Sequence, residues 1–162
     1  MIAVSDANIL ILFARTGYFH LLSEIFNSIF ISPLVYQEVV VAGNGRPGIE
    51  EIRMVQTIEV QSIQLPDYFD DIEHFSLGQA DASVILLAME KQPDFLLSDD
   101  RRVRGVAQAL RMPIMGSGGL LIVAKAKRLI TSVRPVLEQF KQNGARIGDR
   151  TFQDILRAAN ES

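Results

Sequence analysis

Two aspartates follow two short apolar runs, at the positions where strands of a parallel sheet would end. Asp6 follows the run at 2–5, and Asp99 follows the run at 94–98. Ligands of open α/β sheets bind at the carboxyl ends of the strands, near the point where the strand order reverses. If these strands are neighbours, both carboxylates face one crevice. An Asp at such a place also serves as a helix N-cap. We favour the N-cap for Asp100 and a functional role for Asp6 and Asp99.

A third carboxylate lies on the apolar stripe of a helix predicted at 77–91. Asp81 shares this stripe with Val84 and Ile85. An ionised carboxylate on a core-facing stripe is costly unless it is paired with a cation or bound to a metal. We favour the metal, and an ion pair with an arginine is the alternative. Glu38, on a helix predicted at 33–42, is a fourth candidate because it accompanies the other three.

These four carboxylates predict a metal site built from oxygen ligands. The chain has no cysteine, and its 2 histidines have no partner at metal-ligand spacing. Mg²⁺ and Mn²⁺ prefer oxygen ligands and keep waters for a phosphate substrate. Two such ions can activate a water and stabilise the leaving oxygen of a phosphodiester.

The elements that would position these residues alternate between strand and helix. Apolar runs predict strands at 2–5, 29–32, 57–63, 94–98 and 113–115. Helical spacing predicts helices at 8–16, 17–26, 33–42, 47–55, 77–91, 100–111, 119–128, 133–143 and 150–159. Strands separated by helices imply right-handed crossovers and a parallel sheet covered on both faces. The fold class is therefore α/β, with helices following the last strand.

The length and composition predict one ordered domain. The 162 residues are 48% hydrophobic, which excludes disorder, and the absence of cysteine excludes disulfides. We expect the main domain to cover 1–130, with a polar connection at 65–75, and a helical extension at 131–162 to pack on it. No export signal and no apolar run of spanning length is apparent. We therefore expect a cytoplasmic protein that is not inserted in a membrane.

The charge is small but unevenly distributed. The net charge is −3, yet residues 1–98 carry 4 basic and 13 acidic residues, whereas residues 99–162 carry 12 and 6. This asymmetry indicates a cationic face for a polyanion, although solvated basic helix faces explain it equally well. Candidate phosphate contacts near the site are Arg101, Arg102, Arg104 and Ser117. Ser117 belongs to the glycine-rich turn at 116–119, which tight packing of a helix on the sheet would also explain.

In this order, the segments VSDAN, VYQEVV, LGQADASVILLA and LLSDDRRVRGVA resemble a PIN domain over about residues 1–130. The segment MPIMGSGGLLIVAKAKRLI resembles more narrowly a prokaryotic subfamily of PIN-like proteins predicted to bind nucleic acid. The resemblance implies a three-layer α/β/α sandwich around a parallel sheet of four to five strands. It implies an acidic quartet in which Asp6 and Asp99 would bind metal directly, Asp81 would bridge to or bind a second ion, and Glu38 would act through water. Asn8 matches a small polar residue two positions beyond the first Asp and is a further candidate substrate or phosphate contact. That subfamily often has an acidic residue where this chain has Gln79. The quartet is Asp6, Glu38, Asp81 and Asp99.

PIN domains are typically metal-dependent ribonucleases, and many are toxins paired with a small antitoxin protein. The resemblance therefore implies an endoribonuclease that uses Mg²⁺ or Mn²⁺ to hydrolyse single-stranded or structured RNA. Gln79 supports the alternative, a non-catalytic PIN-like regulator that binds RNA or protein. We also expect a homodimer, because the apolar hairpin at 9–13 and 17–25 carries more hydrophobic surface than one helix face buries.

Overall fold

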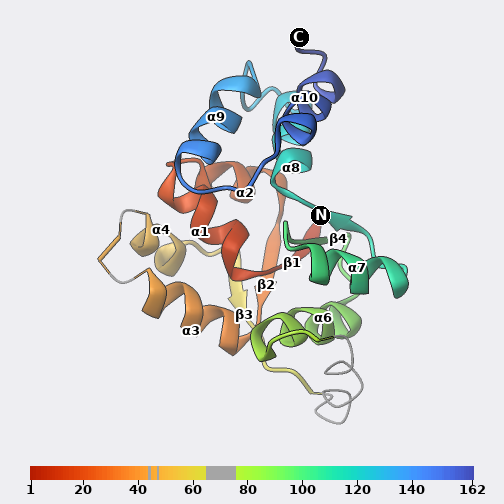
Figure 1. Ribbon diagram of the computed structural model, residues 1–162. Coiled ribbons are helices and arrows are strands. Elements are labelled where there is room, and N and C mark those ends of the chain that lie inside the picture. Colours follow the sequence, from red (N-terminus) through yellow and green to blue (C-terminus); the bar gives the residue numbers. More distant parts are fainter. Residues whose placement is uncertain (44, 47, 65–75) are drawn as a thin grey trace.

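A parallel sheet organises the chain. The computed structural model describes residues 1–43, 45–46, 48–64 and 76–162 (Figure 1). The strands are β1 (Ile2–Ser5), β2 (Ser28–Ile31), β3 (Ile58–Val60), β4 (Phe95–Leu97) and β5 (Ile114–Met115). Within the described residues they form one five-stranded sheet in the order β3-β2-β1-β4-β5, with every pairing parallel. The strand order reverses at β1 and β4, which lie side by side.

Helices cover both faces of this sheet. They are α1 (Ala7–Arg15), α2 (Phe19–Ile25), α3 (Pro33–Ala42), α4 (Ile49–Met54), α6 (Gln79–Lys91), α7 (Arg101–Ala109), α8 (Ser117–Ala126), α9 (Arg134–Gln142) and α10 (Asp149–Ala158). Helix α6 packs against β1, β2 and α7, while α2 packs against α1 and α8 on the opposite side (Figure 1). This arrangement confirms the predicted α/β/α sandwich. None of the described helices is both long and apolar enough to cross a membrane.

Polar side chains that follow the strands are the N-caps of three of the helices. The Asp6 side chain accepts from a backbone N–H of α1, and the Ser32 side chain does the same for α3. Pro33 follows at the first helical position, where its missing N–H costs nothing. Asp100 Oδ1 accepts from the N–H groups of Arg102 and Val103, at 2.7 and 3.2 Å. The predicted N-cap role of Asp100 is therefore confirmed.

The observed elements follow the predicted ones with small differences at their ends. The third strand is shorter than predicted, covering Ile58–Val60 rather than 57–63. It is an edge strand that pairs on one side only, with β2, so its ladder ends early. The polar connection predicted at 65–75 lies outside the described residues.

The apolar hairpin of α1 and α2 is buried within the chain, contrary to our prediction. Ile9, Phe13 and Leu22 have no exposed surface. Phe140 of α9 covers this hairpin, since its ring lies 5.0 Å from that of Phe13 in an edge-to-face arrangement. The expectation of exposed surface was wrong because the C-terminal helices supply the missing cover. The homodimer stays a prediction, but the fully buried side chains of this hairpin are not available for it.

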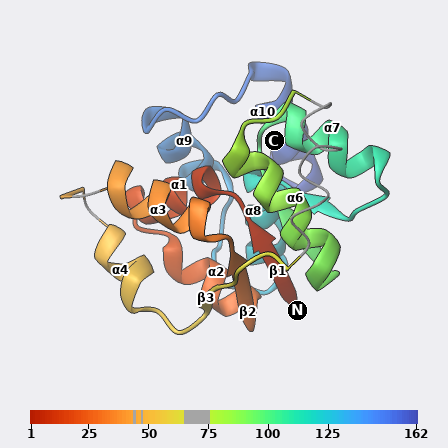
Figure 2. The same ribbon diagram turned by 90° about the horizontal axis from the view of Figure 1, so that it is seen from below.

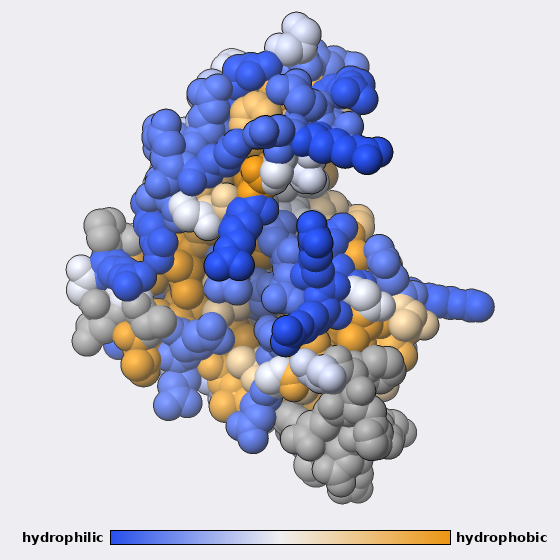
Figure 3. Space-filling view, viewed as in Figure 1, coloured by the Kyte–Doolittle hydropathy of each residue, from blue (hydrophilic) through white to orange (hydrophobic). Residues whose placement is uncertain are grey.

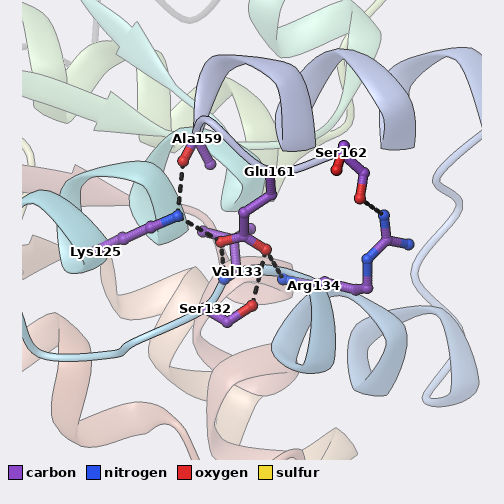
Figure 4. Close-up of polar contacts among 7 residues, drawn as sticks. All are labelled: Lys125, Ser132, Val133, Arg134, Ala159, Glu161 and Ser162. Atoms are coloured by element: carbon purple, nitrogen blue, oxygen red, sulfur yellow. Dashed lines mark hydrogen bonds and ion pairs between the residues drawn. The ribbon is translucent and has the colours of Figure 1, made fainter.

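The end of the chain is fastened by Glu161 (Figure 4). Its carboxylate accepts from Lys125 Nζ at 2.8 Å, from Ser132 Oγ at 2.8 Å and from the Val133 N–H at 2.7 Å. The Arg134 N–H donates to it as well, at 3.1 Å. One carboxylate, three residues beyond the end of α10, thus joins this part of the chain to α8 and to the start of α9.

Candidate active site

Asp6 and Asp99 lie at the same edge of the sheet. Ser5 pairs with Leu97 in the register of β1 and β4, and the Asp6 N–H donates to the Leu97 carbonyl at 3.1 Å. The chain therefore leaves both strands at one level, with Asp6 directly after β1 and Asp99 two residues after Leu97. This is the carboxyl edge at the strand-order reversal, where ligands of such sheets bind.

Asp6 is a buried carboxylate whose two oxygens differ in their hydrogen bonding. Its side chain is 3% exposed, and Oδ1 accepts from the Ile9 N–H at 3.0 Å. Oδ2 is buried and has no hydrogen-bond partner among the described residues. Burial, together with the charges of Asp99 and Asp81, raises the pKa of the Asp6 carboxyl from 3.8 to about 7, against the Ser98 side chain and the Ile9 N–H, which lower it. An ionised Asp6 thus needs a countercharge at Oδ2.

Asp81 and Glu38 approach the same place from two helices. Asp81 is half-buried in the first turn of α6, and burial raises its pKa, with a further contribution from the charge of Asp100. Glu38 is at an exposed position of α3, where residual desolvation and the charge of Asp81 raise its pKa. The charges of Asp99 and Asp81 therefore act on Asp6, and the charge of Asp81 acts on Glu38.

The structure does not support the ion-pair interpretation of Asp81. Among the described residues, no basic side chain lies within 4.0 Å of its carboxylate. Arg102 is near enough to lower its pKa in part. Asp81 is thus a carboxylate with a raised pKa and only a distant cation.

Asp99 is held by the turn before α8. Its Oδ1 accepts from the Ser117 N–H at 2.8 Å. A Cβ added at Gly116 would lie 2.5 Å from this oxygen, so only glycine leaves room for the carboxylate. Asp99 is itself exposed, which leaves its second oxygen accessible.

The predicted phosphate contacts have different environments. Arg101, Arg102 and Asn8 are exposed, whereas Ser117 is buried and gives its N–H to Asp99. Arg104 is partly buried, and its Nη1 donates to the Ser98 carbonyl at 3.2 Å. Figure 3 shows hydrophilic residues gathered over the middle of this face, below the C-terminal helices.

A family model described as a PIN domain matches residues 2–161. The chain belongs to the PIN-domain family. No curated protein matches it. The match includes α9 and α10, and the division at residue 130 stays a prediction. PIN domains have a nuclease-like fold and typically use divalent metals.

The carboxylate oxygens of this PIN domain are suitable ligands for a hard divalent cation, but the four side chains are not close enough together to hold one ion as they stand. Carboxylate oxygens are the ligands that Mg²⁺ and Mn²⁺ prefer, and the orphaned Oδ2 of Asp6 is a buried acceptor in need of positive charge. Within the described part of the chain, no three acidic or histidine side chains form a group that could hold one ion as they stand.

Sequence patterns did not reveal two features of this PIN domain. Gly116 is required for the space it leaves beside Asp99, and a glycine directly after a strand was its only signal. The glycines that follow it serve packing, since a Cβ on Gly118 would meet the Ile155 side chain and one on Gly119 would lie 2.8 Å from Met115. Asp100 was assigned only to the cap of α7, yet its charge also acts on Asp81.

Gly116→Ala is expected to displace the Asp99 carboxylate. The new Cβ would lie 2.5 Å from Asp99 Oδ1 and 3.1 Å from Arg104 Nη1, so both side chains must move. We expect a loss of about 1–3 kcal/mol in unfolding free energy, as for other overpacked sites, together with weaker Mn²⁺ binding. Thermal melts and calorimetric titration measure the two effects.

The matched control is Gly105→Ala on α7, where an added Cβ has no neighbour within 4 Å. Removing a helical glycine should raise the unfolding free energy by roughly 0.5–1 kcal/mol and leave Mn²⁺ binding unchanged. Equal Mn²⁺ affinity in Gly116→Ala and the wild type would show that Asp99 does not depend on this space.

Proposed function

We propose that this PIN-domain protein is a metal-dependent endoribonuclease that hydrolyses RNA phosphodiester bonds. The observation that carries the proposal is the buried Oδ2 of Asp6, which lacks a partner among the described residues and senses the charges of Asp81 and Asp99. An ionised carboxylate buried like Asp6 is costly unless a cation neutralises it. A divalent ion supplies that charge and links the cluster to a phosphate substrate.

In this proposal Asp6, Asp81 and Asp99 hold Mg²⁺ or Mn²⁺, and Glu38 orients the attacking water. When bound, such ions lower the pKa of a water and stabilise the leaving oxygen. Ser117 fixes Asp99 through its N–H. Because burial raises the pKa of Asp6 to about 7, a proton must leave this carboxyl on metal binding below that pH.

Arginines on α7 complete the proposed substrate site. Arg104 is tethered at Nη1 to the Ser98 carbonyl, so its remaining N–H groups are held near Asp99. Arg101 and Arg102 are exposed at the start of the same helix. Guanidinium groups bind phosphate through two parallel hydrogen bonds. With Asn8 exposed in the first turn of α1, these residues would contact the RNA backbone rather than its bases.

Asp99→Asn tests the proposed metal site. We expect wild type to bind Mn²⁺ in a calorimetric titration and to cleave single-stranded RNA in Mg²⁺ or Mn²⁺. Asp99→Asn should bind at least about tenfold more weakly, since even residues behind metal ligands are worth 10–100-fold. Asp154→Asn, a change at an exposed position of α10, is the control. Equal Mn²⁺ affinity of wild type and Asp99→Asn would show that Asp99 is not a metal ligand.

Protein partners belong to the same proposal. A small antitoxin protein and a second copy of the chain are the candidates. Their support is the apolar surface that the structure exposes on α3 and α4, where Val41 is 67% and Met54 81% exposed (Figure 3). Light scattering of the purified protein separates a homodimer from a monomer.

A non-catalytic regulator that binds RNA or protein is the second candidate function. It is favoured by Gln79, which is exposed at the start of α6 where the related subfamily often has a carboxylate. The open arrangement of the carboxylates in the described residues favours it as well. RNA binding by the wild type without cleavage in any divalent metal would support this candidate over the nuclease.

A further inference from the structure

A buried hydrogen bond joins the two helices that carry Glu38 and Asp81. Ser32 and Ser83 are both completely buried, and their Oγ atoms lie 2.6 Å apart. Ser32 caps the N-terminus of α3, and Ser83 lies in α6 two residues beyond Asp81. The two serines are 51 residues apart in the sequence, so this contact is tertiary.

The neighbours of the two hydroxyls fix the direction of this bond. Ser83 Oγ donates its only proton to the Ala80 carbonyl at 2.5 Å. Ser32 must therefore donate to Ser83, while Ser32 Oγ itself accepts from the Val35 N–H at 3.1 Å. The result is a continuous chain from the first turn of α3 to the first turn of α6. Such buried, fully satisfied chains are rigid because no water competes for their members.

This chain acts where the two carboxylates oppose each other. Helices α3 and α6 pack together, and Figure 2 shows the N-terminal part of α6 beside the start of α3. Glu38 and Asp81 extend from these helices and sense each other's charge. Two ionised carboxylates on neighbouring helices repel each other before a cation binds. The uncharged Ser32–Ser83 hydrogen bond between the same helices opposes their separation.

We infer that the Ser32–Ser83 hydrogen bond positions Glu38 and Asp81 for metal binding by fixing the spacing of α3 and α6. The inference rests on the proposed function, in which both carboxylates serve the metal site. Ser32 and Ser83 touch neither metal nor substrate and are positioning residues. Their removal should weaken metal binding even in protein that remains folded, because the carboxylates then close on the ion from a wider range of separations.

A mutant cycle read by Mn²⁺ affinity tests this inference. Ser83→Ala removes the link between the helices but leaves the Ser32 cap of α3 in place. We expect its Mn²⁺ affinity to fall about tenfold, as on loss of groups that orient metal ligands. Ser32→Ala and the double variant also lose the α3 cap, so the double variant is compared with Ser32→Ala; adding Ser83→Ala to Ser32→Ala should weaken Mn²⁺ binding little further, because the link is already gone and the two effects are not additive. Titrations are run well below the melting temperature of each variant.

Ser23→Ala is the matched control, since the buried Ser23 hydroxyl on α2 has no partner among the described residues. It should bind Mn²⁺ like the wild type. If Ser83→Ala does not fold, Ser83→Cys, a weaker donor of similar size, should show a smaller loss in the same direction. Wild-type affinity in folded Ser83→Ala would overturn the inference and leave the metal site standing. Absence of Mn²⁺ binding by the wild type would overturn both.

Discussion

Asp81→Asn is expected to lower RNA cleavage at least about 100-fold, since a direct metal ligand costs no less than the groups behind it. The metal-free protein should melt at an unchanged or slightly higher temperature. Burial raises the pKa of Asp81, so its ionised form costs the folded state free energy at neutral pH. This cost is present above the folded pKa and disappears as the pH falls below the unfolded value. Asn removes it.

An Asp81 that forms an ion pair predicts the opposite result. If Asp81 were the partner of a buried arginine, the substitution would orphan a charge and cost roughly 3–5 kcal/mol. Thermal melts at pH 7, with and without Mn²⁺, are measured beside a cleavage assay normalised to folded protein. A large drop in melting temperature with normal cleavage per folded molecule would show that Asp81 has no catalytic role.

Glu161→Ala is expected to lower the unfolding free energy by about 3 kcal/mol, because it leaves four partly buried donors without their charged acceptor. For a chain of this size, that corresponds to a fall of roughly 6–12 °C in melting temperature. The donors are Lys125 Nζ, Ser132 Oγ and the N–H groups of Val133 and Arg134. Lys125 keeps one bond, to the Ala159 carbonyl at 2.7 Å. Glu138→Ala, at an exposed position of α9, is the control and should change little.

The effect of Glu161 should depend on pH. Desolvation alone would raise the pKa of this carboxyl, but the hydrogen bonds from Lys125, Val133, Ser132 and Arg134 outweigh it and lower the pKa from 4.5 to about 2. A lowered folded pKa means that the stabilisation is complete above about pH 4.5 and is lost as the pH falls towards 2. The difference between wild type and Glu161→Ala should therefore shrink over this range. A difference that is constant from pH 7 to pH 2 would contradict the ionic role of Glu161.

Local sequence determined the elements and much of the candidate site. Alternating short apolar runs and helical stripes predict a parallel sheet between helices, because strand and helix periods differ and crossovers have one hand. Asp6 and Asp99 were found from their places after strands, and the N-cap of Asp100 from the helix that follows it. These inferences need only neighbouring residues and the general geometry of parallel sheets.

Only the tertiary structure shows which side chains from distant parts of the sequence contact each other. The hairpin of α1 and α2 looked exposed in the sequence, but Phe140, more than 100 residues away, covers it. The lone Oδ2 of Asp6, the space that Gly116 leaves for Asp99, and the Ser32–Ser83 bond all depend on contacts between distant segments. Periodicity reports which side of an element is apolar. It carries no information on which distant side chain meets that side, since the partner is chosen by packing of the whole chain.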